Sequence, residues 1–576
     1  MTSDVLTSST DSSSAPFDTD VLVVGAGPIG LITAAALRHH GVACRLIEQR
    51  ADTKAYSRAN NLWARVQELL TGVGLRDALA EQAYVVTEAR TVLNGRPVDP
   101  VALDDVESPF PNALYSGQDV METTLSDLVA DRGAPVERSR RLVGLEQDAE
   151  GVTVTVADAG DHDGDSDAAA GTERIRCRYV VGADGSSGQV RELLGLPLET
   201  ESFPGRINRQ VDAKLSWRRS TEPDHLTFFY YQPNGFTGVL PIWGGYHRLY
   251  FVQDDTGVPD RDPTLEEMQA LAREVTQDET LTLTDPIWFS RNRFSHGVTS
   301  HYAVDRVLLA GDAGHLTMPI GGQGMNAGIH DAVAVAWRLA MVLAGHADPV
   351  VLDSYDQERR GEHARLDHQQ ARGFKTTVER GKVTDLGLDA ASRFVPGIGS
   401  LIQGTDDLQQ LSVHYPDSAL NEDHLGGRLL HHKAPKAGER APDARVVDQH
   451  GATTHLFAHT QNPDGWTWGW SLLAFDGGVE DPQGHRAAAV DAVSPWAWVR
   501  PRLVTGASTT PPAGGGVVEL DDLDHVAHAA YGLKERPALV LVRPDGHIAY
   551  RGSADDPGRL VDYCTRVFGP AGGTPA

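Results

Sequence analysis

One stretch near the N-terminus, residues 20–50, most constrains what this chain can fold into. The apolar run Val21–Val24 predicts a buried strand, and a glycine-rich turn follows it. Leu31–His40 then predicts a helix, and Cys44–Glu48 predicts a second strand that ends in an acid. A strand, a G-x-G-x-x-G turn, a helix and a second strand in this order are typical of a dinucleotide-binding unit.

Each conspicuous residue of this stretch has a predicted physical role. Gly25 allows the tight turn, Gly27 lets backbone N–H groups approach a pyrophosphate, and Gly30 lets the helix pack closely on the strand. The phosphates would lie at the helix N-terminus, where backbone donors point outward. Glu48 stands where an acid binds a ribose hydroxyl. The stretch therefore predicts that the chain binds a dinucleotide.

Composition excludes several other classes of function. The chain has 79 acidic against 51 basic residues and a net charge of −28, which argues against nucleic acid or an anionic membrane as partner. Its three cysteines are scattered without C-x-x-C, so we expect neither disulfides nor a zinc site, and a cytoplasmic location. Residues 1–19 are polar and predict a disordered tail rather than a signal peptide. No apolar run reaches transmembrane length.

Two further strand ends carry glycine and acid. A predicted hairpin, with strands at Val152–Val156 and Arg174–Val181, ends in Gly182-Ala-Asp184-Gly185, a common turn when it is read alone. The predicted strand Val307–Leu309 opens into a glycine-rich loop, residues 311–326, before a long predicted helix, Ala327–Leu343. Such a loop offers backbone donors to an anion. His315 in this loop has no acid at triad-like or metal-ligand spacing, so by itself it indicates packing or hydrogen bonding rather than a base.

Residues 203–299 differ from the rest in being locally aromatic. Alternating stretches at Leu226–Tyr231, Thr237–Ile242 and Tyr246–Gln253 predict an antiparallel sheet, which one helix, Thr264–Thr276, interrupts. Such a sheet either covers a pocket for a flat apolar ligand or is an ordinary sheet core. If it forms a pocket, the residues expected to contact the substrate are Tyr231, Trp243 and Tyr250.

The C-terminal quarter predicts a domain of its own. A charged helix, Tyr355–Gln369, and a connecting region precede a Pro- and Gly-containing linker at 435–442. From there to residue 567 predicted strands and helices alternate, which indicates a small α/β domain.

Together the three glycine motifs resemble those of the class A flavoprotein monooxygenases, the single-component aromatic hydroxylases typified by para-hydroxybenzoate hydroxylase and phenol hydroxylase. The resemblance covers residues 20 to about 360. Arg536–Gly546 resembles part of the thioredoxin-like C-terminal domain of longer members, which act on phenols and polyketide-type aromatics. Because no C-x-x-C is present, we expect that domain to serve dimer contacts or act as a structural lid.

The resemblance implies an α/β fold with three domains. A Rossmann-type FAD-binding domain would comprise residues 20–82, 115–202 and 300–360. An inserted antiparallel-sheet substrate domain would comprise 83–114 and 203–299. A helical connecting region, 361–434, would lead to a thioredoxin-like C-terminal domain, 435–576.

The resemblance also implies roles for single residues. Those expected to bind FAD are Gly25, Gly27, Gly30, Glu48, Arg58, Gln118, Asp184, Asp312, Gly324, Met325 and Asn326. Pro319 would lie beside the flavin near the substrate, and His315 and Arg248 are weak candidates for catalysis. NAD(P)H would visit a surface groove, because only one dinucleotide fingerprint is present. Gly188, Gly314 and Ala334 depart from residues common in the family, and Gly188 weakens the nicotinamide assignment.

The implied reaction is hydroxylation of a phenolic or polyketide-type aromatic with NAD(P)H and O2, by way of a flavin hydroperoxide. A cytoplasmic enzyme and a homodimer would fit the relatives. Baeyer–Villiger oxidation and inactivation of an aromatic antibiotic share every motif. A flavin halogenase is a weaker alternative, since Gly465–Trp470 echoes a tryptophan-rich halogenase motif in the wrong domain. A flavin-binding protein without turnover is the alternative from another class.

Overall fold

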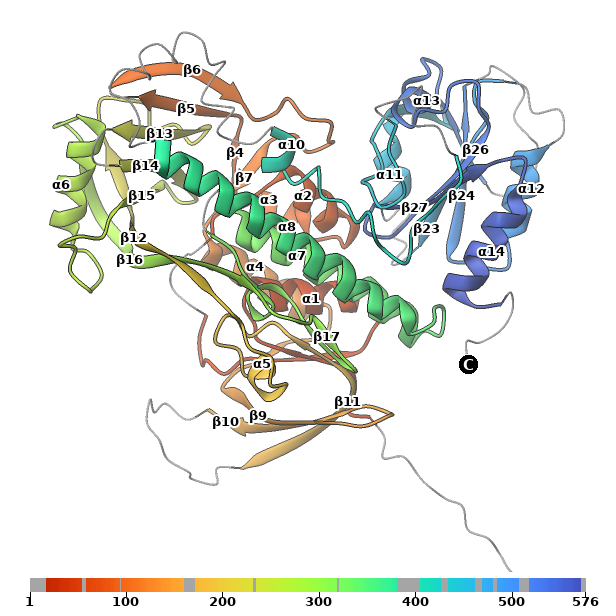
Figure 1. Cartoon of the computed structure of the whole chain (residues 1–576), viewed down its shortest axis with the longest axis horizontal. Helices are drawn as coiled ribbons and strands as arrows, with labels where there is room; N and C mark the ends of the chain where they lie inside the picture. Colours follow the sequence, from red (N-terminus) through yellow and green to blue (C-terminus); the bar gives the residue numbers. More distant parts are fainter. Residues whose placement is uncertain are drawn as a thin grey trace, which may run out of the picture.

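The computed structural model describes residues 17–53, 59–93, 95–159, 171–231, 235–318, 321–380, 405–425, 434–461, 469–479, 484–506 and 517–570. Within these ranges the chain forms three eight-stranded sheets and one three-stranded sheet. Figure 1 shows the first sheet at the bottom, the second at the upper left and the third at the right, with helices between them. Two predicted site residues, Arg58 and Pro319, lie outside the described residues, as does most of the predicted N-terminal tail.

The first sheet has the order β17-β18-β11-β1-β2-β8, and β9 and β10 extend it beside β11. Its strands are β1 (Thr19–Val24), β2 (Cys44–Ile47), β8 (Val136–Glu137), β9 (Arg140–Gln147), β10 (Val152–Asp158), β11 (Thr172–Gly182), β17 (Ala303–Val304) and β18 (Val307–Leu309). The strands from β18 to β8 along this order are parallel. Helices α1 (Pro28–His39), α4 (Gln118–Asp131) and α7 (Gln323–Leu343) cover it. The strand, helix and strand expected from residues 20–50 are confirmed.

The parallel pairing brings the three glycine motifs to one edge of this sheet. Val24 pairs with Gly182, and Gly182 pairs with Leu309, so the carboxyl ends of β1, β11 and β18 lie level. The residues that follow these three ends are the first glycine turn, the Asp184 turn and the Gly311 loop. Ligands of open α/β sheets bind at this edge, which makes it the place to look for the dinucleotide site.

The second sheet has the order β19-β16-β12-β15-β14-β13-β5-β6. Its strands are β5 (Glu88–Leu93), β6 (Arg96–Ala102), β12 (Glu201–Ser216), β13 (His225–Tyr231), β14 (Gly235–Ile242), β15 (Tyr246–Asp254), β16 (Thr282–Val298) and β19 (His315–Leu316). The antiparallel strands expected at residues 226–253 are confirmed. β4 (Tyr84–Val86) and β7 (Ala113–Tyr115), expected in this sheet, instead pair with β3 (Asn61–Leu62).

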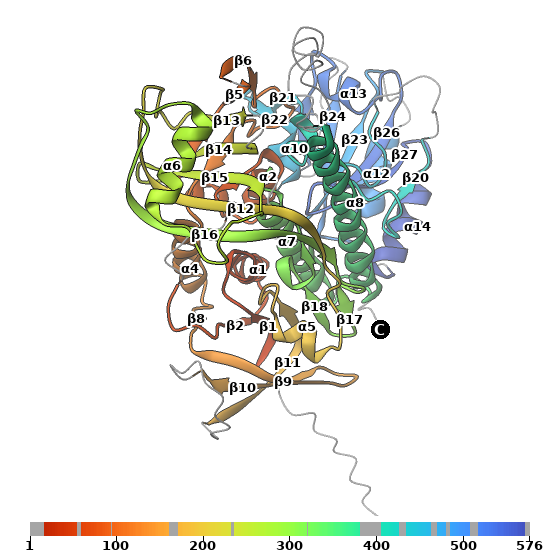
Figure 2. The ribbon, with the colours of Figure 1, turned by 60° about the vertical axis from the view of Figure 1, so that its left-hand side comes forward.

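The two faces of the second sheet have different partners. Odd-numbered residues of its central strands, such as Val211, Val239 and Leu249, pack against α6 (Leu265–Thr276), which begins with a capping box at Thr264. The even-numbered residues Phe228 and Tyr250 belong to the core cluster that also holds residues of α1 and α7. Figure 2 shows α6 on the outer side of the sheet. The even-numbered residues therefore form the inner face, which points toward the first sheet and its helices.

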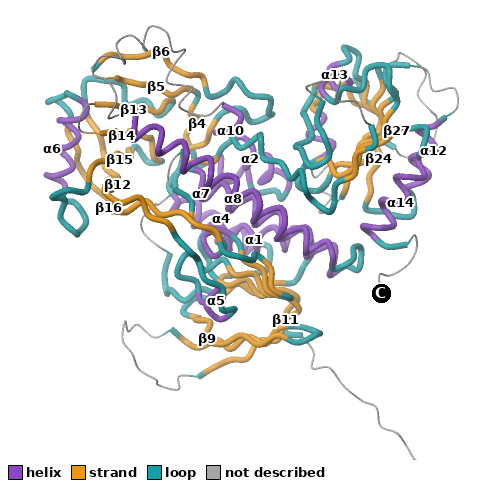
Figure 3. The backbone as a smooth tube through the Cα atoms, viewed as in Figure 1, coloured by secondary structure: helices purple, strands orange, loops and turns teal. Residues whose placement is uncertain are grey.

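The third sheet has the order β20-β27-β26-β23-β24-β25-β21-β22. Its strands are β20 (Glu422–Asp423), β21 (Arg445–Asp448), β22 (Thr453–His455), β23 (Trp470–Phe475), β24 (Val499–Thr505), β25 (Val518–Asp521), β26 (Ala538–Val542) and β27 (Ile548–Ser553). Its helices are α11 (Leu456–Thr460), α12 (His485–Val493), α13 (Val526–Ala530) and α14 (Pro557–Phe568). This mixed sheet, with helices on both faces, confirms the expected thioredoxin-like α/β domain (Figure 3).

The remaining helices connect these parts. They are α2 (Ala64–Gly72), α3 (Arg76–Ala80), α5 (Gln189–Leu193), the 3-10 turn η1 (Gly311–Ala313), α8 (Val350–Arg380) and α10 (Thr405–Leu408). Helix α8 is longer at both ends than the helix expected at 355–369, and it runs across the middle of the molecule (Figure 1). None of the described helices is long and apolar enough to cross a membrane.

Candidate active site

The first glycine turn leaves open space where a phosphate would approach. Gly25 has a φ of +100°, and a Cβ there would lie 2.5 Å from the Ala183 carbonyl oxygen, so only glycine fits. A Cβ at Gly30 would collide with the Gly25 carbonyl oxygen, which shows how closely α1 packs on the turn. By contrast, a Cβ at Gly27 would meet nothing within 4 Å. The backbone is thus tightly held around a position that remains accessible, as pyrophosphate binding requires.

Two helix N-termini at this edge are suited to an anion. Gly27 is the N-cap of α1 and Gly322 is the N-cap of α7. In the described structure neither terminus has a side-chain cap, and neither helix carries an acid in its first turn. The positive end of each helix dipole therefore favours bound negative charge.

Glu48 follows β2 and is held in its charged form. Its side chain is 5% exposed, and Oε2 accepts a 2.8 Å hydrogen bond from the Ala26 N–H of the glycine turn. Oε1 accepts from the backbone N–H and the Nε of Arg50, each at 3.0 Å. Although burial opposes it, these bonds with Arg50 and Ala26 lower the pKa of Glu48. A fixed carboxylate beside the turn is the arrangement expected for binding a ribose hydroxyl.

Asp184 lies at the end of β11, where its carboxylate starts a short helix. Oδ2 accepts a 3.0 Å hydrogen bond from the Val190 N–H in α5. Burial raises the pKa of Asp184 above its usual value, although backbone hydrogen bonds oppose the shift. A Cβ at Gly188 would collide with this carboxylate. The serine that is common in the family at this position would therefore not fit beside Asp184 where it lies here. Arg191 donates to the Ala313 carbonyl at 2.9 Å and so ties α5 to the third motif.

The third motif presents both exposed and buried groups. Asp312 lies exposed in η1, and Gly324 and Met325 are half-buried in the first turn of α7. Asn326 is fully buried, and its amide is used within the chain: Oδ1 accepts from the Trp63 N–H at 3.0 Å, and Nδ2 donates to the Asn61 carbonyl at 3.0 Å. Asn326 thus fixes α7 against the segment before α2, and its cofactor role stays a prediction.

Gln118 is the first residue of α4, and its Oε1 accepts a 3.1 Å hydrogen bond from the Ala59 N–H. It therefore lies beside the segment that follows the glycine unit. Arg58 precedes Ala59 but lies outside the described residues. The roles of Gln118 and Arg58 in binding FAD stay predictions.

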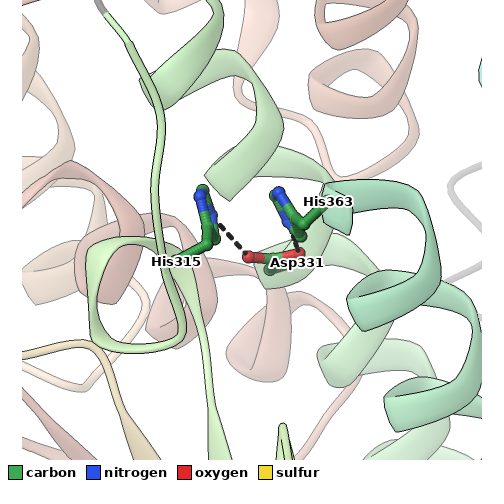
Figure 4. Close-up of side chains that lie close together, drawn as sticks. All are labelled: His315, Asp331 and His363. Atoms are coloured by element: carbon green, nitrogen blue, oxygen red, sulfur yellow. Dashed lines mark hydrogen bonds and ion pairs between the residues drawn. The ribbon is translucent and has the colours of Figure 1, made fainter. Parts of the chain in front are cut away.

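The expectation that His315 has no partner acid is wrong. His315 is 1% exposed, and its Nε2 lies 3.3 Å from Oδ2 of Asp331 in α7. On the same carboxylate, Oδ1 lies 3.0 Å from Nε2 of His363 in α8, and the two imidazoles stack with centroids 3.5 Å apart. Figure 4 shows both rings directed at Asp331. Asp331 also accepts a 2.9 Å hydrogen bond from the Gly311 N–H, so this buried hub holds the start of the third motif.

Three residues of the kinds that ligate metals, two histidines and one aspartate, meet in this hub, but its charge is already balanced. Arg359 donates from Nε to Oδ1 of Asp331 at 2.7 Å, and its Nη2 lies 3.2 Å from Nε2 of His363. Although burial opposes it, His363 and Arg359 lower the pKa of Asp331 well below its usual value. Burial, with His315, lowers the pKa of His363 to about 3. A divalent cation would add uncompensated buried charge beside the Arg359 guanidinium, so we expect a structural ion pair here, and the absence of a metal stays a prediction.

The inner face of the second sheet combines aromatic rings with a buried ion pair. Arg248 on β15 donates from Nε and Nη2 to the two oxygens of Asp212 on β12, both at 2.8 Å, and its guanidinium lies 4.8 Å from the Trp288 ring centroid. Burial raises the pKa of Asp212, although Arg248 opposes the shift. The Tyr250 ring covers Gly238, where a Cβ would collide with it.

The other predicted substrate residues are less central. Trp243 is half-buried beyond the end of β14, with its ring 4.9 Å from that of Tyr84. Tyr231 ends β13, and its side chain lies outside the described part of the structure. The catalytic and substrate roles of these residues, and of Tyr250, Arg248, His315 and Pro319, stay predictions.

Comparison with known proteins decides the family. A model of the FAD binding domain matches residues 18–368, and a model of the aromatic-ring hydroxylase C-terminal domain matches residues 434–571. The chain belongs to the FAD-dependent aromatic-ring hydroxylases. The edge described above fits the cofactor, because Gly27 at the N-terminus of α1 faces open space and the Glu48 carboxylate is fixed beside the same turn.

Curated relatives and a solved structure agree with this family over most of the chain. The 12-dehydrotetracycline 5-monooxygenase/anhydrotetracycline 6-monooxygenase of Streptomyces rimosus is 32% identical over 573 residues, which cover 96% of this chain and 99% of the relative. The rifampicin monooxygenase of Streptomyces venezuelae is 34% identical over 59% of this chain and 68% of its own length. The structure of the anhydrotetracycline hydroxylase OxyS from Streptomyces rimosus superimposes with a TM-score of 0.69 at 26% identity, covering 96% of this chain and 99% of that one. The protein is thus an FAD-dependent aromatic monooxygenase that uses NAD(P)H.

Proposed function

We propose that this enzyme uses NAD(P)H and O2 to hydroxylate a polycyclic phenolic aromatic of the polyketide type. The observation that carries the proposal is the inner face of the second sheet. There Phe228, Phe236 and Tyr250 gather beside the buried pair of Arg248 and Asp212. Aromatic side chains suit a flat fused-ring ligand, and the few polar groups among them would fix its orientation. The 12-dehydrotetracycline 5-monooxygenase/anhydrotetracycline 6-monooxygenase matches this chain over nearly its full length, which supports a fused-ring aromatic substrate.

Bound FAD would supply electron transfer from NAD(P)H and activation of oxygen. The chain's own residues would do the rest. Gly27 and the α1 N-terminus would hold the pyrophosphate, Glu48 the ribose, and the α7 N-terminus would stabilise negative charge on the isoalloxazine.

The proposal is tested with the FAD-loaded enzyme and a panel of phenols and fused-ring polyketides. We expect NAD(P)H oxidation that the substrate stimulates and a product that carries one atom from 18O2. A product with an expanded lactone ring would instead indicate Baeyer–Villiger oxidation. NAD(P)H oxidation that no aromatic stimulates, with no oxygenated product, would contradict the proposal and favour a flavin-binding protein without turnover.

Location and assembly are parts of the same proposal. The three cysteines are buried and unpaired, which supports a reducing compartment such as the cytoplasm. A homodimer is proposed from the resemblance, and light scattering of the purified protein tests it.

A further inference from the structure

Two buried amides on β12 have no partner for their carbonyl oxygens. Asn208 is 2% exposed and Gln210 is 7% exposed. Within the described structure, Asn208 Oδ1 and Gln210 Oε1 are each buried and accept no hydrogen bond. A buried acceptor without a donor costs free energy, so each of these two oxygens calls for a partner, which a ligand can supply.

Both amides lie on the inner face of the second sheet. Gln210 pairs with Tyr250, and Asn208 pairs with Val252, on the neighbouring strand β15. Val252 packs against Phe294 and Met318, and Met318 lies in the loop that leads into α7. The odd-numbered neighbours of the amides on β12 face α6 instead. Asn208 and Gln210 thus point toward the third glycine motif, on the side where the flavin and the substrate would meet.

We propose that Asn208 and Gln210 select the substrate by binding two oxygen substituents along one edge of its ring system. Residues two apart on a strand lie about 6.7 Å from each other on the same face. Each amide can accept from a hydroxyl or donate to a carbonyl oxygen. A single phenol would complete only one of them, whereas a fused-ring aromatic with two oxygens on one edge completes both. This inference rests on the proposed function and specifies the substrate class.

The neighbours of the amides support this reading. Tyr250 and Phe236 lie on the next two strands with ring centroids 5.5 Å apart, so they offer apolar contact to the ring system whose edge the amides would hold. The pair of Arg248 and Asp212 lies two residues further along the same strands, opposite one another. Along the inner face of β12, the two amides whose oxygens lack a hydrogen-bond donor are thus followed by Asp212, which is paired with Arg248. The amides are the groups on this strand that a ligand would complete.

The test uses the FAD-loaded enzyme and two matched probes, 2,7-dihydroxynaphthalene and 2-naphthol. The first carries two hydroxyls on one long edge, and the second carries one. Binding is followed by the change in flavin absorbance for the wild type and for Asn208→Leu and Gln210→Met. The control is Arg209→Leu, on the same strand but on the outer face, where Arg209 donates to Gln253 at 2.9 Å.

We expect the wild type and the control to bind the dihydroxy probe about tenfold more tightly than 2-naphthol, since each added hydrogen bond is worth about that factor. In either amide variant the ratio of the dissociation constants of 2-naphthol and 2,7-dihydroxynaphthalene should fall toward one. The melting temperature of the ligand-free variants should stay or rise, because an uncompleted buried amide has been removed.

Three results would overturn the inference. An unchanged preference for the dihydroxy probe in the amide variants would show that the amides do not bind the second oxygen. Loss of bound flavin from the variants would assign the amides to the cofactor instead. A lower melting temperature with equal loss of both probes would make them structural. Failure of the proposed function looks different: the wild type would then form no oxygenated product, whatever its preference between the probes.

Discussion

At the residue scale, Gly27 and Gly30 of the same turn differ in whether a side chain would fit. A Cβ at Gly30 collides with the Gly25 carbonyl, whereas a Cβ at Gly27 enters open space, and Gly27 has an ordinary φ of −73°. We expect Gly27→Ala to fold normally and to lose about ten- to a hundredfold in FAD affinity, because a methyl group occupies the path of the phosphate. Gly30→Ala should lose more than about 3 kcal/mol of stability.

Flavin content after purification and the melting temperature of the apoprotein separate these two effects. A Gly27→Ala variant that keeps full flavin affinity would show that the phosphate does not approach this position. A Gly30→Ala variant as stable as the wild type would contradict the close packing of α1 on the turn.

Asp331 supports a second prediction at this scale. Its carboxylate binds Arg359, two imidazoles and the Gly311 N–H in a fully buried setting. Asp331→Asn leaves the Arg359 guanidinium uncompensated, so we expect a loss of about 3–5 kcal/mol in denaturant unfolding of the apoprotein. Asp312→Asn is the matched control, because Asp312 is exposed in the same motif and its loss should cost less than about 0.5 kcal/mol. Equal losses of stability in Asp331→Asn and Asp312→Asn would contradict the prediction that Asp331 compensates a buried charge.

The same hub predicts that metal removal has no effect. Because Arg359 already neutralises Asp331, we expect dialysis against EDTA to leave the melting temperature unchanged and elemental analysis to find no stoichiometric zinc. One bound metal ion per chain whose removal lowers the melting temperature would show that His315, Asp331 and His363 are ligands.

How far the sequence predicts single residues depends on chain distance. The Gly25, Asp184 and Asp312 motifs are each local, so their turns could be predicted from a few neighbouring residues. Arg359 and His363 could not be, because they reach Asp331 from 28 and 32 residues away on another helix. No spacing rule connects such positions. The signal for buried ion pairs between α7 and α8 lies in the two charges of the mostly apolar helix α7, Asp331 and Arg338, and Arg338 donates to Glu358 of α8.

At the scale of elements, His528 ties together the ends of three neighbouring strands. Its Nε2 lies 2.9 Å from Asp476 after β23, and its Nδ1 lies 2.7 Å from Asp522 after β25. Asp476 also accepts a hydrogen bond from the Gly506 N–H after β24 at 3.0 Å. Although burial opposes it, Asp476 and Asp522 raise the pKa of His528. The imidazolium is thus held between two carboxylates.

This arrangement predicts a pH dependence of stability. A raised pKa in the folded state means that the contribution of His528 is fully present below its unfolded pKa of about 6.5. It is lost as the pH rises through the higher folded value. We expect His528→Gln to lower the stability of the C-terminal domain by about 1–3 kcal/mol near pH 6 and by less near pH 9. Melting curves of both proteins across this range test the prediction, and a constant difference would contradict it.

Periodicity predicts elements better than it predicts their ends or partners. The central strands of the second sheet are rich in aromatic and aliphatic residues, which predicts their type but not which face meets α6. β4 and β7 are short, and nothing in Tyr84–Val86 says which sheet it joins. Helix α8 begins earlier than expected because Val351 in its first turn is buried in the core, although Pro349 and the residues before it resemble a loop.

At the scale of the whole molecule, buried charges join the C-terminal domain to the rest of the chain. Arg440 donates to both oxygens of Glu68 in α2, at 2.9 and 2.5 Å. Arg543 at the end of β26 donates to both oxygens of Glu358 in α8, at 2.6 and 3.1 Å. The apolar cluster around Trp470 also includes Trp337 of α7. The C-terminal domain is therefore packed as an integral part of the chain.

We predict that the wild type unfolds in one calorimetric transition. Glu68→Gln leaves Arg440 and Arg65 without their counter-charge at this contact and should cost about 3 kcal/mol. We expect the variant to show two transitions, one for each side of the contact. The control is Glu422→Gln, which removes an ion pair to Arg566 that lies within the C-terminal unit. Two transitions in the wild type would mean that the contact contributes little.

The sequence predicts that a thioredoxin-like domain exists but not where it packs. Glu68 and Arg440 are 372 residues apart, and each reads as an ordinary surface charge in its own segment. Only the assembled fold shows that both are buried. A dimer role for this domain stays a prediction, whereas its contacts with α2, α7 and α8 are observed.

Strand β19 limits how this enzyme can be re-engineered. His315–Leu316 belongs to the loop that would hold the flavin, yet it is also the edge strand of the second sheet through its pairing with Gly297 and Val298. A graft that replaces residues 201–298 with those of a relative would pair a foreign strand with this chain's own residues 315 and 316. Substrate specificity can consequently not be exchanged by transferring residues 201–298 alone. A working chimera has to carry the donor's own version of residues 315 and 316, and with them part of its cofactor site.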